Sequence, residues 1–111
     1  MAIFWSEEID EVLGVGDSLE PIGVRNWALT AAQAIEAIAR LSSAGVAVLG
    51  GDVYSLESGC IEQNYDSWFC NRNNCESEAD FVIRSALKAK GYIERYDVLN
   101  GGVFFALVPR V

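Results

Sequence analysis

Apolar residues recur at helical spacing in three segments of the chain, which predicts three helices. The first spans about Glu7 to Leu13, with Ser6 as its N-cap. The second follows Thr30, which forms a capping-box pattern with Gln33. Its buried stripe is expected to consist of Ala31, Ala34, Ile35, Ile38 and Leu41, and Gly45 ends it.

The third helix is expected to begin after Ser77, with Asp80 at its third position. Its core stripe repeats at intervals of three and four residues: Val82, Ala86, Ala89, Ile93 and Tyr96. Asn100-Gly101-Gly102 then has the composition of a turn.

Short apolar runs between these helices predict strands. Val46 to Leu49 is apolar on both faces, and Val53 and Tyr54 continue it after Gly50-Gly51, where we expect a bulge or a close backbone approach. A turn over Ser55 to Gly59 leads to a second arm, Cys60 to Tyr65. Asp66 to Cys75 is expected to be a loop, and Val103 to Val108 a last strand ended by Pro109.

This order of elements predicts an α+β fold in one domain, residues 1–111. We expect a small, mainly antiparallel sheet of about three to four strands, with about three helices packed on one face. Gly14-Val15-Gly16 resembles the start of a dinucleotide-binding fingerprint, but it follows a helix and lacks the third glycine. We therefore interpret it as a turn.

The excess of acidic over basic residues limits which classes of molecule the chain is expected to bind. The chain carries 16 acidic and 8 basic residues, a net charge of −8. Direct nucleic-acid binding is therefore not expected, whereas a basic protein would be attracted. The N-terminal residues have no basic region followed by a long apolar run, and no segment is long enough to span a bilayer. We expect a cytoplasmic protein without membrane contact.

The residue types present argue against an enzyme. The chain has no histidine, which removes histidine-based nucleophile systems and most zinc sites. Cys60, Cys70 and Cys75 cannot complete a four-ligand zinc set, and no cofactor or metal is expected. We expect three free thiols, with a Cys70–Cys75 disulfide only in an oxidising compartment.

Three carboxylates provide the alternative, a metal-dependent hydrolase built from Asp52, Glu62 and Asp66. We favour the simpler interpretation, in which Asp52 accepts hydrogen bonds from backbone amides at a bulge. The runner-up, which we prefer to the hydrolase, is an accessory subunit or small-ligand module with its site on the sheet face or at Gly50-Gly51-Asp52.

Aromatic and acidic residues gather around Tyr65-Asp66-Ser67-Trp68-Phe69, a pattern typical of a protein interface. Packing in the core is the better interpretation for Trp68 taken alone. The predicted partner-binding residues are Asp52, Tyr54, Glu62, Tyr65, Asp66 and Trp68.

Three segments together carry a family resemblance: Trp27-Ala-Leu-Thr30, Ala47-Val-Leu-Gly-Gly-Asp-Val-Tyr54 and Tyr65-Asp-Ser-Trp-Phe-Cys70. Over residues 25–108 the chain resembles the immunity protein 40 family, bacterial immunity proteins of polymorphic toxin and contact-dependent inhibition systems. The resemblance implies a non-enzymatic protein that binds and neutralises the C-terminal toxin domain of a cognate effector. We expect that toxin to be basic and a nuclease, and we expect the chain to be a monomer or weak homodimer.

Overall fold

Three helices form where the apolar spacing predicts them. The computed structural model describes residues 3–57, 59–100 and 102–111. In it, α1 spans Glu7–Leu13, α2 spans Ala31–Ser43 and α3 spans Glu78–Asn100. Each helix has an amphipathic sequence, so tertiary burial of one face stabilises it more than local propensity does.

Side-chain caps fix the start of each helix. The hydroxyl of Ser6 accepts a hydrogen bond from the Ile9 amide in α1. At the start of α2, Thr30 and Gln33 form both bonds of a capping box, as predicted. Ser77 accepts from the amide of Asp80 at the start of α3. These bonds satisfy amides that have no partner within the helix.

The main sheet has three antiparallel strands in the order β4-β3-β5. Their bounds are Val48–Glu57 for β3, Cys60–Phe69 for β4 and Val103–Pro109 for β5. A separate two-stranded sheet pairs β1 (Asp17–Ser18) with β2 (Trp27–Ala28), and a short 3-10 helix, η1 (Glu20–Ile22), lies between them. The predicted α+β class with a mainly antiparallel sheet is confirmed.

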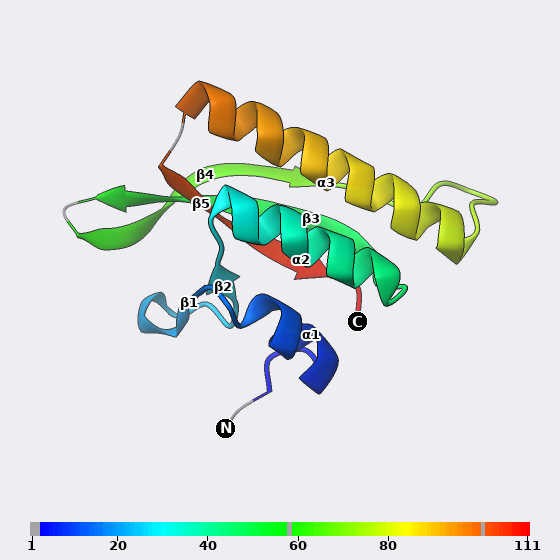
Figure 1. Ribbon diagram of the computed structural model, residues 1–111, viewed down its shortest axis with the longest axis horizontal. Helices are drawn as coiled ribbons and strands as arrows, with labels where there is room; N and C mark the ends of the chain where they lie inside the picture. Colours follow the sequence, from blue (N-terminus) through cyan, green and yellow to red (C-terminus); the bar gives the residue numbers. More distant parts are fainter. Residues whose placement is uncertain (1–2, 58, 101) are drawn as a thin grey trace.

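Helices α2 and α3 run in opposite directions, side by side, over one face of the sheet (Figure 1). The main core lies between this helix layer and the sheet. From the sheet it receives Val48, Val53, Trp68, Phe105 and Leu107, and from the helices Ala34, Ile38, Leu41, Ala89 and Ile93. Burial of these apolar side chains provides the main stabilisation, at about 25 cal/mol per Å² removed from water.

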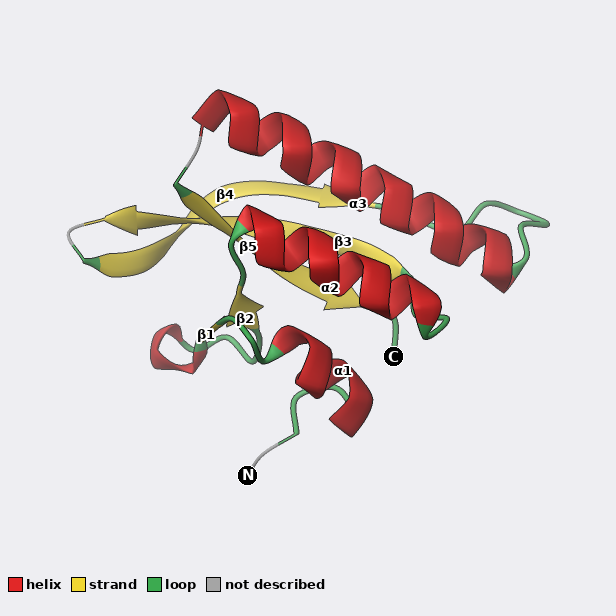
Figure 2. Cartoon of the chain, in the orientation of Figure 1, coloured by secondary structure: helices red, strands yellow, loops and turns green. Residues whose placement is uncertain are grey.

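The segment that contains β1, η1 and β2 lies beside the β5 edge of the sheet (Figure 2), and its apolar side chains pack on the face away from α2 and α3. Leu19 and Ala28 of this segment pack against Tyr54 and Ala106. The side-chain amide of Asn26 donates a 2.8 Å hydrogen bond to the Leu107 carbonyl. Two-residue strands leave no periodic signal, so the apolar pattern of the sequence predicts neither β1 nor β2.

Four predicted element boundaries are wrong. The strand expected from Val46 begins only at Val48. The β3–β4 hairpin is longer than expected, because β3 continues to Glu57 and β4 begins at Cys60. Most of the predicted turn over Ser55 to Gly59 therefore belongs to strand β3. Ser58, between the two strands, lies outside the described residues. Asp66–Phe69 belongs to β4 and not to a loop, because it pairs with the first half of β3. Asn100 belongs to α3 and not to the following turn, whose Gly101 is also outside the described residues.

Gly50 and Gly51 allow the backbones of the sheet to approach the Trp68 region closely. A Cβ atom on Gly51 would lie 2.3 Å from the Trp68 ring and 2.7 Å from the Ala106 carbonyl oxygen. On Gly50 it would lie 2.3 Å from the Trp68 carbonyl oxygen. The predicted close approach is confirmed, and the register against β5 shifts between Val48 and Gly50.

Candidate protein-binding surface

Strand β4 carries a bulge in which three residues face one residue of β3. Asp52 pairs with Ser67 and Tyr54 pairs with Gln63. A single residue of β3, Val53, therefore lies opposite Asn64, Tyr65 and Asp66. Because β4 is an edge strand, this insertion projects from the border of the sheet.

Tyr65, the middle residue of the bulge, is held in an unusual conformation. Its φ angle is +69°, in the left-handed region that bulky side chains rarely adopt. Its side chain is 85% exposed, the highest value among the large hydrophobic residues described. The ring is therefore available for contact with another molecule.

Hydrogen bonds to α3 brace both sides of Tyr65. The Tyr96 hydroxyl donates to Oδ2 of Asp66 at 2.6 Å and accepts from Nδ2 of Asn64 at 2.9 Å. Asn64 also accepts, through Oδ1, from the Asp66 amide at 2.9 Å. Its Nδ2 lies 3.4 Å from the Ser55 hydroxyl. The two neighbours of Tyr65 are thus tied to the same phenol.

A row of aromatic rings lies beneath this brace. Trp68 and Tyr92 are stacked with centroids 4.7 Å apart, and Tyr92 and Tyr96 are stacked at 5.8 Å. Tyr96 also meets Phe105 edge-on at 6.0 Å. Offset and edge-on contacts of this kind are favourable for rings, so they fix the position of the Tyr96 hydroxyl from below.

The six residues predicted to bind a partner fall into three groups. Glu62, Tyr65 and Asp66 are exposed, and we call these three residues the bulge surface. Trp68 and Tyr54 are 7% and 2% exposed; Trp68 lies in the main core, and Tyr54 lies in the cluster on the opposite face of the sheet. Asp52 is half-buried. The packing interpretation of Trp68 is confirmed.

Asp52 lies on the other face of the sheet from Glu62 and Asp66. Its neighbour Gly51 faces the Trp68 ring on the helix side of the sheet. Asp52 itself pairs with Ala106, which belongs to the cluster on the face away from α2 and α3. Glu62 pairs with Ser55, whose hydroxyl belongs to the brace under α3. Since directly paired residues point to the same face, the three carboxylates of the hydrolase alternative do not converge.

Burial and charge raise the pKa of four groups around the sheet. Burial raises the pKa of Asp52 and, together with the Asp52 charge, that of Tyr54. Burial first and the Asp66 charge second raise the pKa of Tyr92. The hydrogen bond to Asp66 raises the pKa of Tyr96, because the bond requires the phenol proton. Tyr96 therefore remains a donor at neutral pH.

Residues that could bind a metal do not gather in the described part of the chain. No cluster of three or more Cys, Asp and Glu that could hold a metal occurs there. Cys60 and Cys75 are exposed and Cys70 is buried, all as free thiols. At Gly50 and Gly51, the Trp68 backbone and ring lie where a Cβ atom would be, so there is little room for a ligand directly at these two glycines.

The segment between β4 and α3 is fixed by Arg84. Its guanidinium forms two 2.8 Å hydrogen bonds with the Glu76 carboxylate and donates to the Asn71 carbonyl at 2.5 Å. Glu76 also accepts from the Asn73 amide at 2.9 Å. The bonds from Arg84 hold the pKa of Glu76 at about 2. This ion pair orders the chain directly after the bulge strand.

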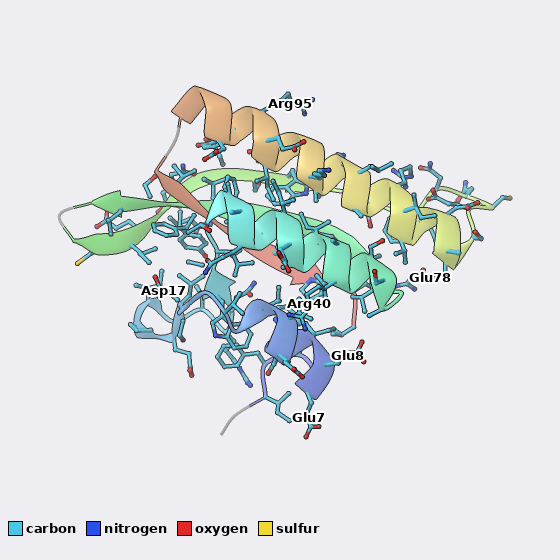
Figure 3. All side chains as sticks on the ribbon, in the orientation of Figure 1. Glu7, Glu8, Asp17, Arg40, Glu78 and Arg95 are labelled. Atoms are coloured by element: carbon cyan, nitrogen blue, oxygen red, sulfur yellow. The ribbon has the colours of Figure 1, made fainter. Side chains whose placement is uncertain are left out.

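Charge is spread unevenly over the molecule. Glu7, Glu8 and Asp17 lie in the N-terminal part, on the side of the molecule away from α3 and Arg95 (Figure 3). The first 24 residues contain six acids and no base. This acidic region is a second surface that could attract a basic partner, so it serves as a comparison for the bulge surface.

Asn64 and Tyr96 contribute to the site, and the sequence analysis did not select them for it. Tyr96 was assigned to the buried stripe of its helix, which is correct for its ring. The function of its hydroxyl depends on a contact 30 residues away in sequence. An Asn next to an exposed aromatic is a weak signal for a bulge, because Asn favours turns and left-handed conformations.

The fold and the site define a small α+β domain with an exposed, acid-flanked aromatic bulge. No described helix is long and apolar enough to cross a membrane. The profile of immunity protein 40 matches residues 18–109, most of the chain. The chain belongs to the immunity protein 40 family. Searches of curated proteins and of solved structures found no match.

Proposed function

We propose that this protein neutralises a cognate bacterial toxin domain by binding it stoichiometrically through the bulge surface. Membership of the immunity protein 40 family supports the immunity function and a protein partner. The observation that carries the choice of surface is Tyr65, an aromatic side chain that is 85% exposed and lies next to an acid. Exposed aromatics of this kind often supply most of the binding energy of an interface.

The toxin domain is proposed to be basic and a nuclease. A nuclease must hold a polyanion, so its active site carries Lys and Arg. A protein with net charge −8 is attracted to such a site, and this attraction raises the association rate. The proposed place of action is the cytoplasm, where a toxin that enters the cell meets its substrate.

The test requires the cognate toxin domain, which is sought as the C-terminal domain of a large secreted protein encoded by a neighbouring gene. Its cleavage of DNA and RNA is measured while the purified immunity protein is added. Cleavage is expected to fall linearly and to end at one equivalent, with a single complex in gel filtration. Full cleavage at a large excess of the immunity protein would contradict the proposal. Inactivation of many equivalents of toxin by one equivalent of this protein would show that it acts as an enzyme.

A further inference from the structure

Tyr65 combines two features that do not help the fold. Its left-handed backbone, with φ at +69°, is a conformation in which Asn or Gly would be more stable. Its side chain is 85% exposed, so packing does not offset that cost. A strained residue that the surrounding structure holds in place is characteristic of functional sites.

Protection of the sheet edge does not explain this residue. Bulges and charges on edge strands prevent unwanted pairing with other chains. Asn64 and Asp66 already provide a polar bulge, and an exposed aromatic between them adds a surface that favours association. The ring of Tyr65 is therefore best explained by a contact outside this chain.

The hydrogen bonds around Tyr65 hold its two neighbours in place. Tyr96 donates to Asp66 and accepts from Asn64, so one hydroxyl on α3 fixes both neighbours of Tyr65. The Asp66 amide donates to Asn64 across Tyr65, which closes the bulge. The Tyr96 ring is itself held between Tyr92 and Phe105.

We propose that Tyr65 is a preformed anchor for the protein partner and that Tyr96 and Asn64 are its positioning residues. This inference rests on the proposed function. A conformation that is ordered before binding loses less entropy when the complex forms. Asp66 then also has a structural role, because its Oδ2 accepts a hydrogen bond from the Tyr96 hydroxyl within this protein.

The partner must offer a matching chemistry. The ring of Tyr65 requires an apolar pocket into which it inserts. Exposed Asp66 follows it directly in β4 and exposed Glu62 lies three residues before it, so the rim of that pocket should carry Arg or Lys. The partner surface is therefore an apolar pocket with a basic rim.

The first measurement needs no partner. Amide hydrogen exchange is compared in the wild type, Tyr96→Phe and the matched control Tyr92→Phe. Each variant loses one phenol hydroxyl and keeps its ring, and the Tyr92 hydroxyl forms no hydrogen bond within the described residues. The Asp66 amide should exchange about 3- to 10-fold faster in Tyr96→Phe, as expected for loss of one hydrogen bond. Equal protection in all three proteins would overturn the positioning role.

The second measurement is a double-mutant cycle with the cognate toxin domain used to test the proposed function. Tyr65→Asn removes the ring and suits the left-handed backbone, and it should weaken binding about 30-fold or more. Tyr96→Phe should weaken binding about 3- to 10-fold. In the Tyr65→Asn background the Tyr96→Phe change should have a much smaller effect than in the wild type, because its main role is to position the Tyr65 ring.

The outcomes separate this inference from the proposed function. A wild-type protein that does not bind the toxin domain would overturn the proposed function. A wild type that binds, with Tyr65→Asn binding equally well, would overturn only the anchor. Additive effects of the two substitutions would show that Tyr96 acts independently of Tyr65 and would also overturn the inference.

Discussion

The hydroxyl of Tyr96 in α3 donates a 2.6 Å hydrogen bond to Oδ2 of Asp66 in β4. This contact joins the helix layer to the edge strand of the sheet at the point where the strand bulges. Its position explains how an edge strand can hold an exposed residue in a left-handed conformation. The same bond makes the bulge surface dependent on the packing of α3.

Replacing Tyr65 by Asn should not destabilise the protein. The left-handed backbone costs a bulky residue about 1–2 kcal/mol, and Asn tolerates it better. We expect the free energy of unfolding to stay equal or rise by up to about 1 kcal/mol. Urea denaturation measures this value, and a clear loss of stability would mean that the Tyr65 ring contributes to the fold.

Two glycines should respond in opposite ways to substitution by Ala. At Gly51 the new methyl group would lie 2.3 Å from the Trp68 ring, so Gly51→Ala should lower the free energy of unfolding by about 1–3 kcal/mol. At Gly91, inside α3, a Cβ has no atom within 4 Å. Gly91→Ala should therefore raise stability by about 0.5–1 kcal/mol. Similar effects in thermal melts at both positions would contradict the described packing.

The ion pair of Glu76 and Arg84 should stabilise the protein at neutral pH and lose this effect in acid. The pKa of Glu76 is lowered from 4.5 to about 2 in the folded protein. A lowered folded-state pKa gives stability that is present above about pH 4.5 and is lost as the pH falls towards about 2. The melting temperatures of wild type and Glu76→Gln should therefore converge over this range. A constant difference would contradict the prediction.

Ionisation of tyrosine should weaken the brace at alkaline pH. The pKa of Tyr96 is raised above 10, chiefly by its bond to Asp66. A raised folded-state pKa gives stability that is present below about pH 10 and is lost as the pH rises through the folded value. Absorbance titrations of the wild type and Tyr96→Phe should differ by one phenol that ionises above the usual tyrosine pKa of 10.0. A difference that corresponds to a phenol ionising at or below that value would contradict the prediction.

The sequence predicts the helices better than the edge strand. Ser6, Thr30 and Ser77 precede strong apolar periodicity, so all three helix starts agree with the structure. Asp66–Phe69 was assigned to a loop because an edge strand exposes many of its side chains and loses the alternation of apolar and polar residues.

The candidate site was predictable only in part. The local cluster of aromatic and acidic residues led to Tyr65 and Asp66, which are exposed. The bulge shifts the faces of β4, so alternation alone could not show that Trp68 is buried or that Asp52 lies on the other face. The link from Asp66 to Tyr96 depends on tertiary packing, which no local pattern contains.

The most direct test of the account compares two surfaces in one titration against the toxin domain. Asp66→Ala removes an acid from the bulge surface, and Glu7→Ala removes an exposed acid from α1. Asp66→Ala should weaken binding by about 2–5 kcal/mol, because it both releases the brace and leaves a partner charge unpaired, whereas Glu7→Ala should change little. Thermal melts confirm that both variants are folded. Wild-type affinity in Asp66→Ala, with loss of binding in Glu7→Ala, would contradict the central claim.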